Sequence, residues 1–227
     1  MKRRRIARCA GVTAAAAGLA FGFTGQATAA SQFALTYTNS NMCVGGESIT
    51  NADAFSSGYT YGYKRNSNGT CTLVNRPTGV LSVEKHLLAY DAPGNVWFTC
   101  ATEGPARNGG SAFRVGIESH YRCGGNLWHA TFTAAYGWDG SAWRGAWVGS
   151  NNEWVPALNL STAPSSPPAA PKTNAADAIK RGEVRLGSPG GPKTTAAQLQ
   201  KPPTVRGDAP VENPPSGGTY TVRTLTR

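Results

Sequence analysis

The chain has 227 residues, of which 22 are Lys or Arg and 12 are Asp or Glu, so its formal net charge is +10. Only 15% of the residues are charged, whereas glycine (28) and proline (15) are frequent, which argues against a coiled coil or a helix-rich enzyme and favours β-structure. The basic excess lies in 1–29 and 161–227, and residues 30–160 carry eight basic and eight acidic residues, so nucleic acid is not expected as a partner.

Residues 1–29 have the layout of a secretory signal peptide. A basic start from Lys2 to Arg8 precedes an apolar stretch from Ala10 to Phe23 and an A-x-A cleavage site at Ala27–Ala29. The apolar stretch is shorter than the roughly 20 residues that a membrane span requires. We therefore predict a secreted, extracellular protein whose mature chain starts near Ala30 and has no membrane anchor.

Four cysteines remain once the signal peptide with Cys9 is removed: Cys43, Cys71, Cys100 and Cys123. An even set in an exported chain predicts two disulfides. Three pairings are possible, and we favour the local one, Cys43–Cys71 with Cys100–Cys123, because each bridge would brace neighbouring strands. There is no C-x-x-C spacing that would indicate a zinc site.

Residues 30–160 are predicted to form one disulfide-braced β-domain. Stretches of strand composition alternate with turn signals such as Asn-Gly, Asp-Gly and Gly-Gly. We predict an antiparallel β-sandwich or small barrel of about eight to ten strands. The expected strands cover Phe33–Thr38, Tyr59–Arg65, Thr70–Val74, Val80–Tyr90, Val96–Ala101, Phe113–Cys123, Trp128–Trp138 and the stretch after Asp139-Gly140 to Val148.

The alternation of side chains in 113–149 predicts two consecutive hairpins. A turn at Gly124-Gly125 would pair Ile117 with Phe132, and a two-residue Asp139-Gly140 turn would pair Phe132 with Trp147. These registers gather the large apolar side chains on one face. We interpret that face as core, with a sugar-binding surface as the alternative.

Five aromatic residues are candidates for ligand contact. Tyr59, Tyr61 and Tyr63 form a stripe on one face of a strand, and exposed tyrosines are good contact residues for proteins and glycans. Trp138 and Trp154 lie at strand or turn ends, where they are expected to be exposed.

The sequence carries no signature of catalysis or of a cofactor. It lacks a nucleophile elbow, an H-E-x-x-H motif, a phosphate-binding loop and a dinucleotide fingerprint. The predicted register sets His120 opposite His129 with Glu118 nearby, and we interpret this as an ordinary polar face, with a zinc or acid–base group as the alternative. If the protein were an inhibitor of a hydrolase, its reactive loop would lie near a disulfide, as Thr102–Gly110 does.

Residues 161–227 are predicted to be a disordered basic tail rich in Pro, Ala and Gly. The segment holds 11 of the 15 prolines and too few apolar residues to offset the chain entropy. Asn174–Val184 has the pattern of a short helix with Asn174 as its N-cap. Thr219–Thr226 has strand composition and could join a sheet edge of this chain or of a partner.

These features favour a secreted, non-catalytic binding or adaptor protein. Its β-domain would recognise a secreted or cell-surface protein, and the tail would act as a tether. A glycan-binding module is the first alternative, and a small secreted hydrolase or hydrolase inhibitor is the second.

Overall fold

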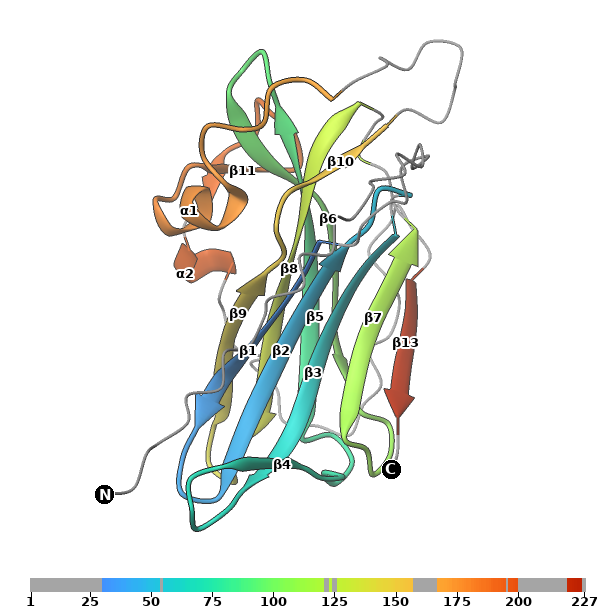
Figure 1. The fold of residues 1–227 in the computed structure, drawn as a ribbon, viewed down its shortest axis with the longest axis vertical. Helices are drawn as coiled ribbons and strands as arrows, with labels where there is room; N and C mark the ends of the chain where they lie inside the picture. Colours follow the sequence, from blue (N-terminus) through green and yellow to red (C-terminus); the bar gives the residue numbers. More distant parts are fainter. Residues whose placement is uncertain are drawn as a thin grey trace, which may run out of the picture.

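The computed structural model describes residues 30–53, 55–120, 123, 126–156, 167–194, 196–199 and 220–225. The predicted signal peptide lies outside these residues, as do 157–166 and 200–219. The described strands form two sheets packed face to face (Figure 1), which confirms the predicted β-sandwich. Ten of the strands lie between Ala30 and Val155, as expected.

The sheet nearer the viewer in Figure 1, here the front sheet, has the strand order β1-β2-β3-β7-β13, and β4 pairs with β3. Its C-terminal strand pairs antiparallel with β7, so the predicted terminal strand joins an edge of its own chain. The front sheet consists of β1 (Ala30–Thr38), β2 (Met42–Thr50), β3 (Phe55–Arg65), β4 (Cys71–Leu73), β7 (Arg114–His120) and β13 (Tyr220–Leu225).

The second sheet, here the back sheet, has the order β10-β8-β5-β6-β11-β12, and β9 also pairs with β8. All its pairings are antiparallel except that of β11 with β6. The back sheet consists of β5 (Leu81–Asp91), β6 (Val96–Arg107), β8 (Leu127–Trp138), β9 (Trp143–Gly149), β10 (Glu153–Val155), β11 (Val184–Leu186) and β12 (Lys193–Thr194).

Both predicted disulfides are present. Cys43–Cys71 joins β2 to β4 within the front sheet, and Cys100–Cys123 ties β6 of the back sheet to the connection that follows β7. Two disulfides indicate an extracellular or otherwise oxidising environment. No helix among the described residues is long and apolar enough to cross a membrane.

The interior between the sheets is partly polar. Ser48 of β2 donates a hydrogen bond to Thr133 Oγ1 of β8 at 2.6 Å, and the Thr50 and Thr131 hydroxyls are 2.6 Å apart across the same interface. These four buried hydroxyls are paired, so their desolvation is compensated. The apolar part of this interior is formed by Leu81, Val83, Ala106, Val115 and Ile117.

A buried ion pair of the back sheet also contacts the front sheet. Lys85 Nζ of β5 lies 2.7 Å from Glu103 Oε2 of β6 and donates to Ser119 Oγ of β7 at 2.6 Å. Burial lowers the pKa of Lys85, and the Glu103 carboxylate opposes this shift. Because both charged side chains are at most 7% exposed, the pair is part of the structure and not a surface that a ligand could reach.

The prediction of a hairpin over 113–138 is wrong. β7 pairs with β3 and β13, whereas β8 pairs with β5, β9 and β10, so Ile117 and Phe132 lie in different sheets. The predicted polar face of β8 is in fact buried: His129, Thr131 and Thr133 are at most 1% exposed. Those side chains face the front sheet, so the chain crosses between sheets where a turn was expected.

The next hairpin, at Asp139-Gly140, is present with a different register. Trp138 pairs with Trp143, and Ala134 pairs with Trp147. Asp139 Oδ1 accepts hydrogen bonds from the backbone N–H groups of Ser141 and Ala142, which extends the loop to four residues. The register differs by two residues, so Trp143 and Trp147 keep the predicted face.

The aromatic face of β8 is the outer face of the back sheet, and part of the predicted tail covers it. Residues 167–199 include the helices α1 (Ala175–Lys180) and α2 (Ala196–Leu199) (Figure 1). Asn174 caps α1 as predicted, because its side chain accepts a hydrogen bond from the N–H of Asp177. The segment was expected to be disordered, but its apolar side chains pack on the sheet in a cluster of Leu88, Tyr90, Trp97, Ala130, Phe132, Ala175, Ala178, Ile179, Val184 and Leu199.

Candidate functional site

The three predicted tyrosines lie together on the outer face of the front sheet. Thr60 of β3 points inward, where its hydroxyl donates a hydrogen bond to the backbone oxygen of Ser82. Strand alternation therefore turns the odd-numbered tyrosines outward. Residues of β1, β2 and β7 on the same side of the sheet complete a surface that we call the tyrosine face: Phe33, Leu35, Glu47, Tyr59, Tyr61, Tyr63, Arg114 and Glu118.

Hydrogen bonds fix two of the three tyrosine rings on this face, those of Tyr59 and Tyr61. The Tyr59 hydroxyl donates to Glu118 Oε1 at 2.8 Å, and the Tyr61 hydroxyl donates to Glu47 Oε2 at 2.5 Å. Arg114 lies between them: its guanidinium stacks 4.3 Å from the centre of the Tyr59 ring, and its Nη1 donates to the Tyr61 oxygen at 3.4 Å. The rings are thus held in place before any ligand arrives.

The electrostatics keep the phenols protonated. Burial raises the pKa of Tyr61, and its hydrogen bond to the Glu47 carboxylate raises it further. Burial also raises the pKa of Tyr59 and of Tyr63, and nearby carboxylates add to both shifts. At neutral pH the three hydroxyls are therefore donors and carry no charge.

Two glycines let the aromatic rings lie close to the sheet. A Cβ at Gly45 would lie 2.8 Å from Phe33 Cζ and 2.9 Å from Tyr63 Cε2, and a Cβ at Gly116 would overlap the Tyr59 ring. These rings therefore occupy the space above the glycines and do not stand upright. The result is a low aromatic surface bordered by carboxylates and a guanidinium.

Exposure separates contact residues from positioning residues on the tyrosine face. Phe33 and Leu35 are each 50% exposed, and Tyr61 and Tyr63 are partly exposed. Tyr59 is only 7% exposed because Arg114 covers its ring. The sequence put all three tyrosines forward for contact, but the structure gives Tyr59 the role of orienting Arg114. It also adds Phe33, Leu35 and Arg114, which the sequence analysis missed.

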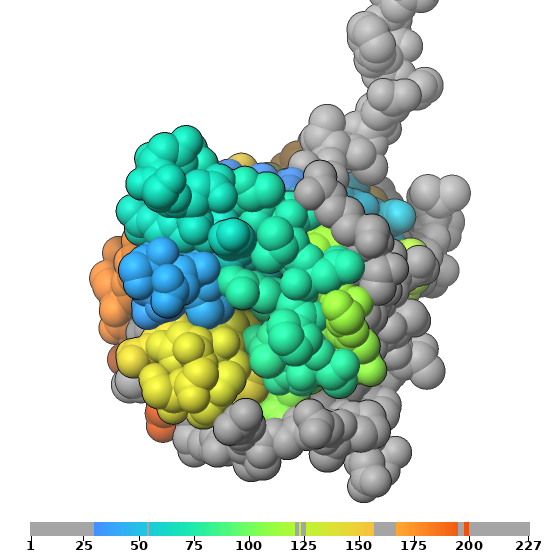
Figure 2. All heavy atoms as spheres, turned by 90° about the horizontal axis from the view of Figure 1, so that it is seen from below, coloured from blue at the N-terminus to red at the C-terminus, as the bar shows by residue number. Residues whose placement is uncertain are grey.

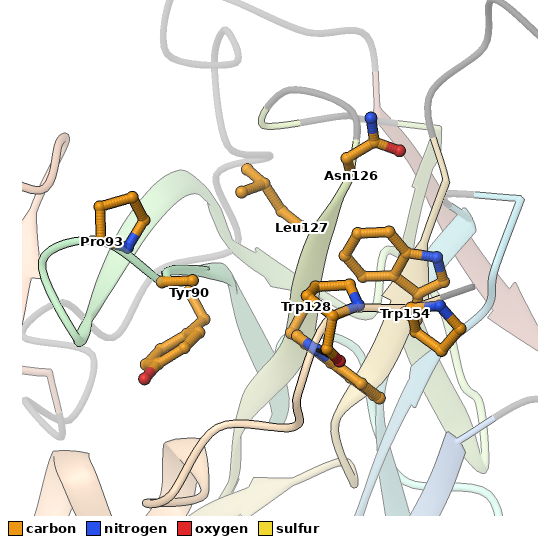
Figure 3. A pocket seen from close by; sticks show the side chains of 9 residues that line it. Tyr90, Pro93, Asn126, Leu127, Trp128 and Trp154 are labelled. Carbon is orange, nitrogen blue, oxygen red and sulfur yellow. Dashed lines mark hydrogen bonds between the residues drawn. The ribbon is translucent and has the colours of Figure 1, made fainter. Parts of the chain in front are cut away.

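Trp154 lies far from the tyrosine face, on the back sheet. It pairs with Trp128 across β10 and β8, and the ring centres are 5.9 Å apart (Figure 3). Together with Tyr90, Pro93 and Leu127 these tryptophans line a cavity of about 400 Å³.

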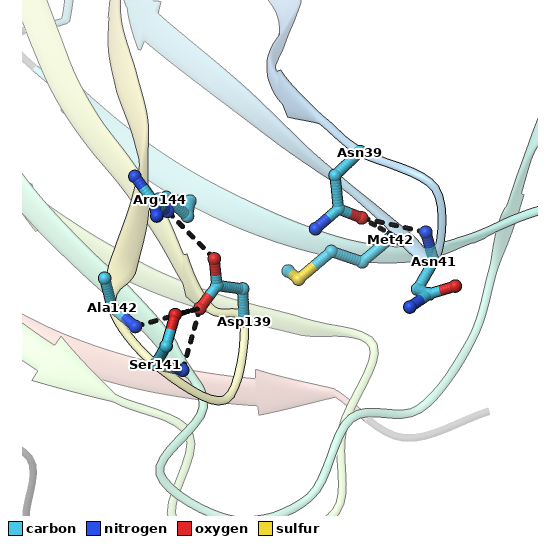
Figure 4. A network of polar contacts seen from close by, with 7 residues as sticks. All are labelled: Asn39, Asn41, Met42, Asp139, Ser141, Ala142 and Arg144. Carbon is cyan, nitrogen blue, oxygen red and sulfur yellow. Dashed lines mark hydrogen bonds and ion pairs between the residues drawn. The ribbon is translucent and has the colours of Figure 1, made fainter.

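Trp138 lies at the opposite end of β8. Turns from both sheets gather at this end of the sandwich (Figure 2). Trp138 lines a cavity of about 280 Å³ with Met42, Arg76 and Asp139. Most of the polar groups drawn in Figure 4 already bond to one another there, as when Arg144 Nε donates to Asp139 Oδ2 at 2.8 Å. The five predicted contact residues therefore belong to three places and not to one site.

The alternative zinc group does not form. His120 and Glu118 are on β7 of the front sheet, whereas His129 is on β8 of the back sheet and buried. Glu118 is engaged by Tyr59, and the His120 ring packs 5.0 Å from that of Phe55. Within the described ranges, no group of three or more His, Cys, Asp or Glu side chains could hold a metal ion.

A polar cluster that the sequence did not predict lies on the outer face of the back sheet. His86 Nε2 lies 2.7 Å from Glu84 Oε1, and His86 Nδ1 lies 3.0 Å from Thr102 Oγ1. The His86 ring also packs 4.7 Å from that of Trp147. Glu84 and His86 alternate onto one face of β5, which the sequence could have shown, but Thr102 joins them only through the pairing of β5 with β6.

The segment considered as an inhibitor loop is mostly strand. Residues Thr102–Arg107 belong to β6 and pair with β5, and Glu103 is buried in the ion pair with Lys85. A protease-binding loop must be exposed and free to bind in extended form, so this segment does not supply one.

In comparisons with known proteins, no family model, no curated protein and no solved structure matches the chain.

Proposed function

We propose that the protein is secreted and acts as a non-catalytic binding protein, which captures an extracellular protein partner on the tyrosine face. The observation that carries the proposal is the exposure of Phe33 and Leu35, each 50%, directly beside Tyr61 and Tyr63. Large apolar side chains exposed next to one another are a mark of contact surfaces. The two disulfides and the signal-like residues 1–29 support export.

The composition of the tyrosine face fits a protein partner. Tyrosine, phenylalanine and arginine are enriched at the centres of protein interfaces. The rings of Tyr59 and Tyr61 are already held by Glu118 and Glu47, so binding would cost little side-chain entropy. Arg114 offers a guanidinium that is oriented by stacking on Tyr59.

The proposal is tested by capturing partners from the culture medium on the immobilised protein. Phe33→Ser with Leu35→Ser should reduce the amount of captured partner at least tenfold, because both side chains would lose their apolar contact area. Leu186→Ser is the matched control, since Leu186 is an exposed apolar residue (39%) of the back sheet and should leave capture unchanged. Equal capture by all variants, or no specific capture, would contradict the proposal.

A glycan is the second candidate ligand, and the close approach of the rings to Gly45 and Gly116 favours it. Rings that lie low on a sheet beside carboxylates can stack on a sugar and bond its hydroxyls. Pull-down on insoluble cell-wall polysaccharides separates the two candidates: retention that Tyr61→Ala and Tyr63→Ala abolish would favour the glycan.

A further inference from the structure

Four aromatic side chains align across the back sheet because the registers of four strands coincide. Trp97 pairs with Tyr90, Tyr90 pairs with Trp128, and Trp128 pairs with Trp154. The ring centres of Trp97 and Tyr90 are 5.3 Å apart, and those of Trp128 and Trp154 are 5.9 Å apart. We call this set the aromatic row; it runs across β6, β5, β8 and β10.

A proline-rich segment of the same chain already lies on the aromatic row. Trp128 Nε1 donates a hydrogen bond to the backbone oxygen of Pro168 at 3.4 Å, and Trp97 Nε1 donates to that of Thr173 at 2.8 Å. The segment between these two contacts reads Pro-Ala-Ala-Pro-Lys-Thr, and residues 167–171 belong to no helix or strand.

Such a contact has a clear chemical basis. Proline lacks an N–H group and has a fixed φ, so a proline-rich segment is extended and offers its carbonyl oxygens as acceptors. Aromatic grooves recognise such segments by packing rings against the pyrrolidines, at a low entropic cost. Trp128 combines both elements here, since it is an aromatic ring with an indole donor directed at a prolyl carbonyl.

The Trp154 end of the row has room for more chain. The cavity of about 400 Å³ lies beside Pro167 and Pro168, and its lining is aromatic, aliphatic or proline except for Asn126 (Figure 3). Trp154 is half-buried, and among the described residues nothing accepts a hydrogen bond from its indole N–H. The cavity therefore presents another ring and another donor of the kind that Trp128 and Trp97 use.

We propose that the cavity between Trp128 and Trp154 binds an extended, proline-rich peptide segment of a partner protein. The partner's prolines would pack against the Trp154 ring, and one of their carbonyls would accept the Trp154 N–H. With one amide as its only polar side chain apart from the tryptophans and Tyr90, the cavity lacks the several polar groups that would orient a sugar. This site is on the opposite sheet from the tyrosine face and does not depend on the function proposed for that face.

The test is a fluorescence-anisotropy titration of the whole protein into a labelled hexaproline peptide. We expect saturable binding that Trp154→Ala weakens at least tenfold. Trp154→Phe, which keeps a ring in β10 and removes the donor, should weaken binding about threefold or more. Trp138→Ala is the matched control, because Trp138 is a half-buried tryptophan at the other end of β8 and its loss should leave the affinity within about twofold.

Several results would overturn the proposal. One is the absence of saturable hexaproline binding, and another is equal binding of a Gly-Ser peptide of the same length. A third is an unchanged affinity in Trp154→Phe together with Trp154→Ala. If Trp154→Ala unfolds, the comparison of Trp154→Phe with the unmodified protein decides alone. Displacement of hexaproline by cell-wall oligosaccharides would show a sugar site instead.

Discussion

The outer faces of the two sheets are both rich in aromatic side chains, but only one of them is covered. On the back sheet, α1 and Leu199 of α2 pack over Trp97, Phe132 and Leu88. On the front sheet, Phe33 and Leu35 remain half exposed beside the tyrosines. The difference shows that aromatic content alone does not distinguish a binding surface from a packed one; a covering segment decides it.

Truncating one aliphatic side chain on each outer face should give the largest difference in the free energy of unfolding. Ile179→Ala removes a side chain that is 5% exposed in the covering segment, and we expect a loss of about 3 kcal/mol in the free energy of unfolding. Leu35→Ala on the tyrosine face should change it by less than about 0.5 kcal/mol. Denaturant unfolding measures both, and similar losses would show that the two faces are equally covered.

One added methyl group should displace a ring of the tyrosine face from its position close to the sheet. Gly116→Ala places a Cβ where the Tyr59 ring now lies, so the ring and Arg114 must shift, at a cost of about 2 kcal/mol. Gly110→Ala is the control, because a Cβ there meets nothing within 4 Å. An unfolding free energy that is the same in both variants would mean that Tyr59 is not held down by its contacts.

Much of this arrangement follows from local sequence, and the rest depends on long-range contacts. Strand alternation, hairpin turns and cysteine spacing led to the sandwich and both disulfides. They failed at 113–138, because a strand such as β8 that is buried on both faces gives no signal of which sheet lies on which side. The low apolar content of 167–199 predicted disorder. Its few apolar residues are enough to order the segment only because they pack against the apolar outer face of the back sheet.

The candidate site was predictable to a similar degree. The period of two in Tyr59, Tyr61 and Tyr63 identified one row of the tyrosine face. Phe33, Arg114 and the carboxylates came from other strands, and their position depends on pairings that the sequence leaves open.

The hydrogen bonds between the aromatic row and its covering segment should contribute less to the free energy of unfolding than the apolar contacts of Ile179 do. Trp97→Phe keeps an aromatic ring and removes the donor to Thr173, so we expect a loss of about 1 kcal/mol. Amides near α1 should then exchange about fivefold faster with solvent. Trp143→Phe is matched to it, because Trp143 is also buried on the back sheet and its indole N–H has no partner among the described residues. Equal exchange in both variants would remove the role of the Trp97 N–H.

The two faces should also differ in which carboxylate raises the pKa of a tyrosine. Burial, and then the charge of Glu84, raises the pKa of Tyr136 on the back sheet to about 12, whereas burial and Glu47 raise the pKa of Tyr61 on the tyrosine face. Each shift stabilises the fold fully below the unfolded pKa of 10.0 and is lost as the pH rises through the folded value, because the unfolded phenol releases its proton first.

Glu84→Gln should therefore lower the pKa of Tyr136 alone, and Glu47→Gln should lower that of Tyr61 alone. Tyrosinate absorbance follows the titrations, and Tyr136→Phe and Tyr61→Phe identify each step. The lowered pKa of Lys85 makes stability rise with pH up to its unfolded value of 10.5, but this contribution is common to all the variants and cancels in the comparison. If either Gln substitution moved both titrations together, the two faces would be electrostatically coupled through the sandwich, and the covered and uncovered surfaces could not be treated as independent.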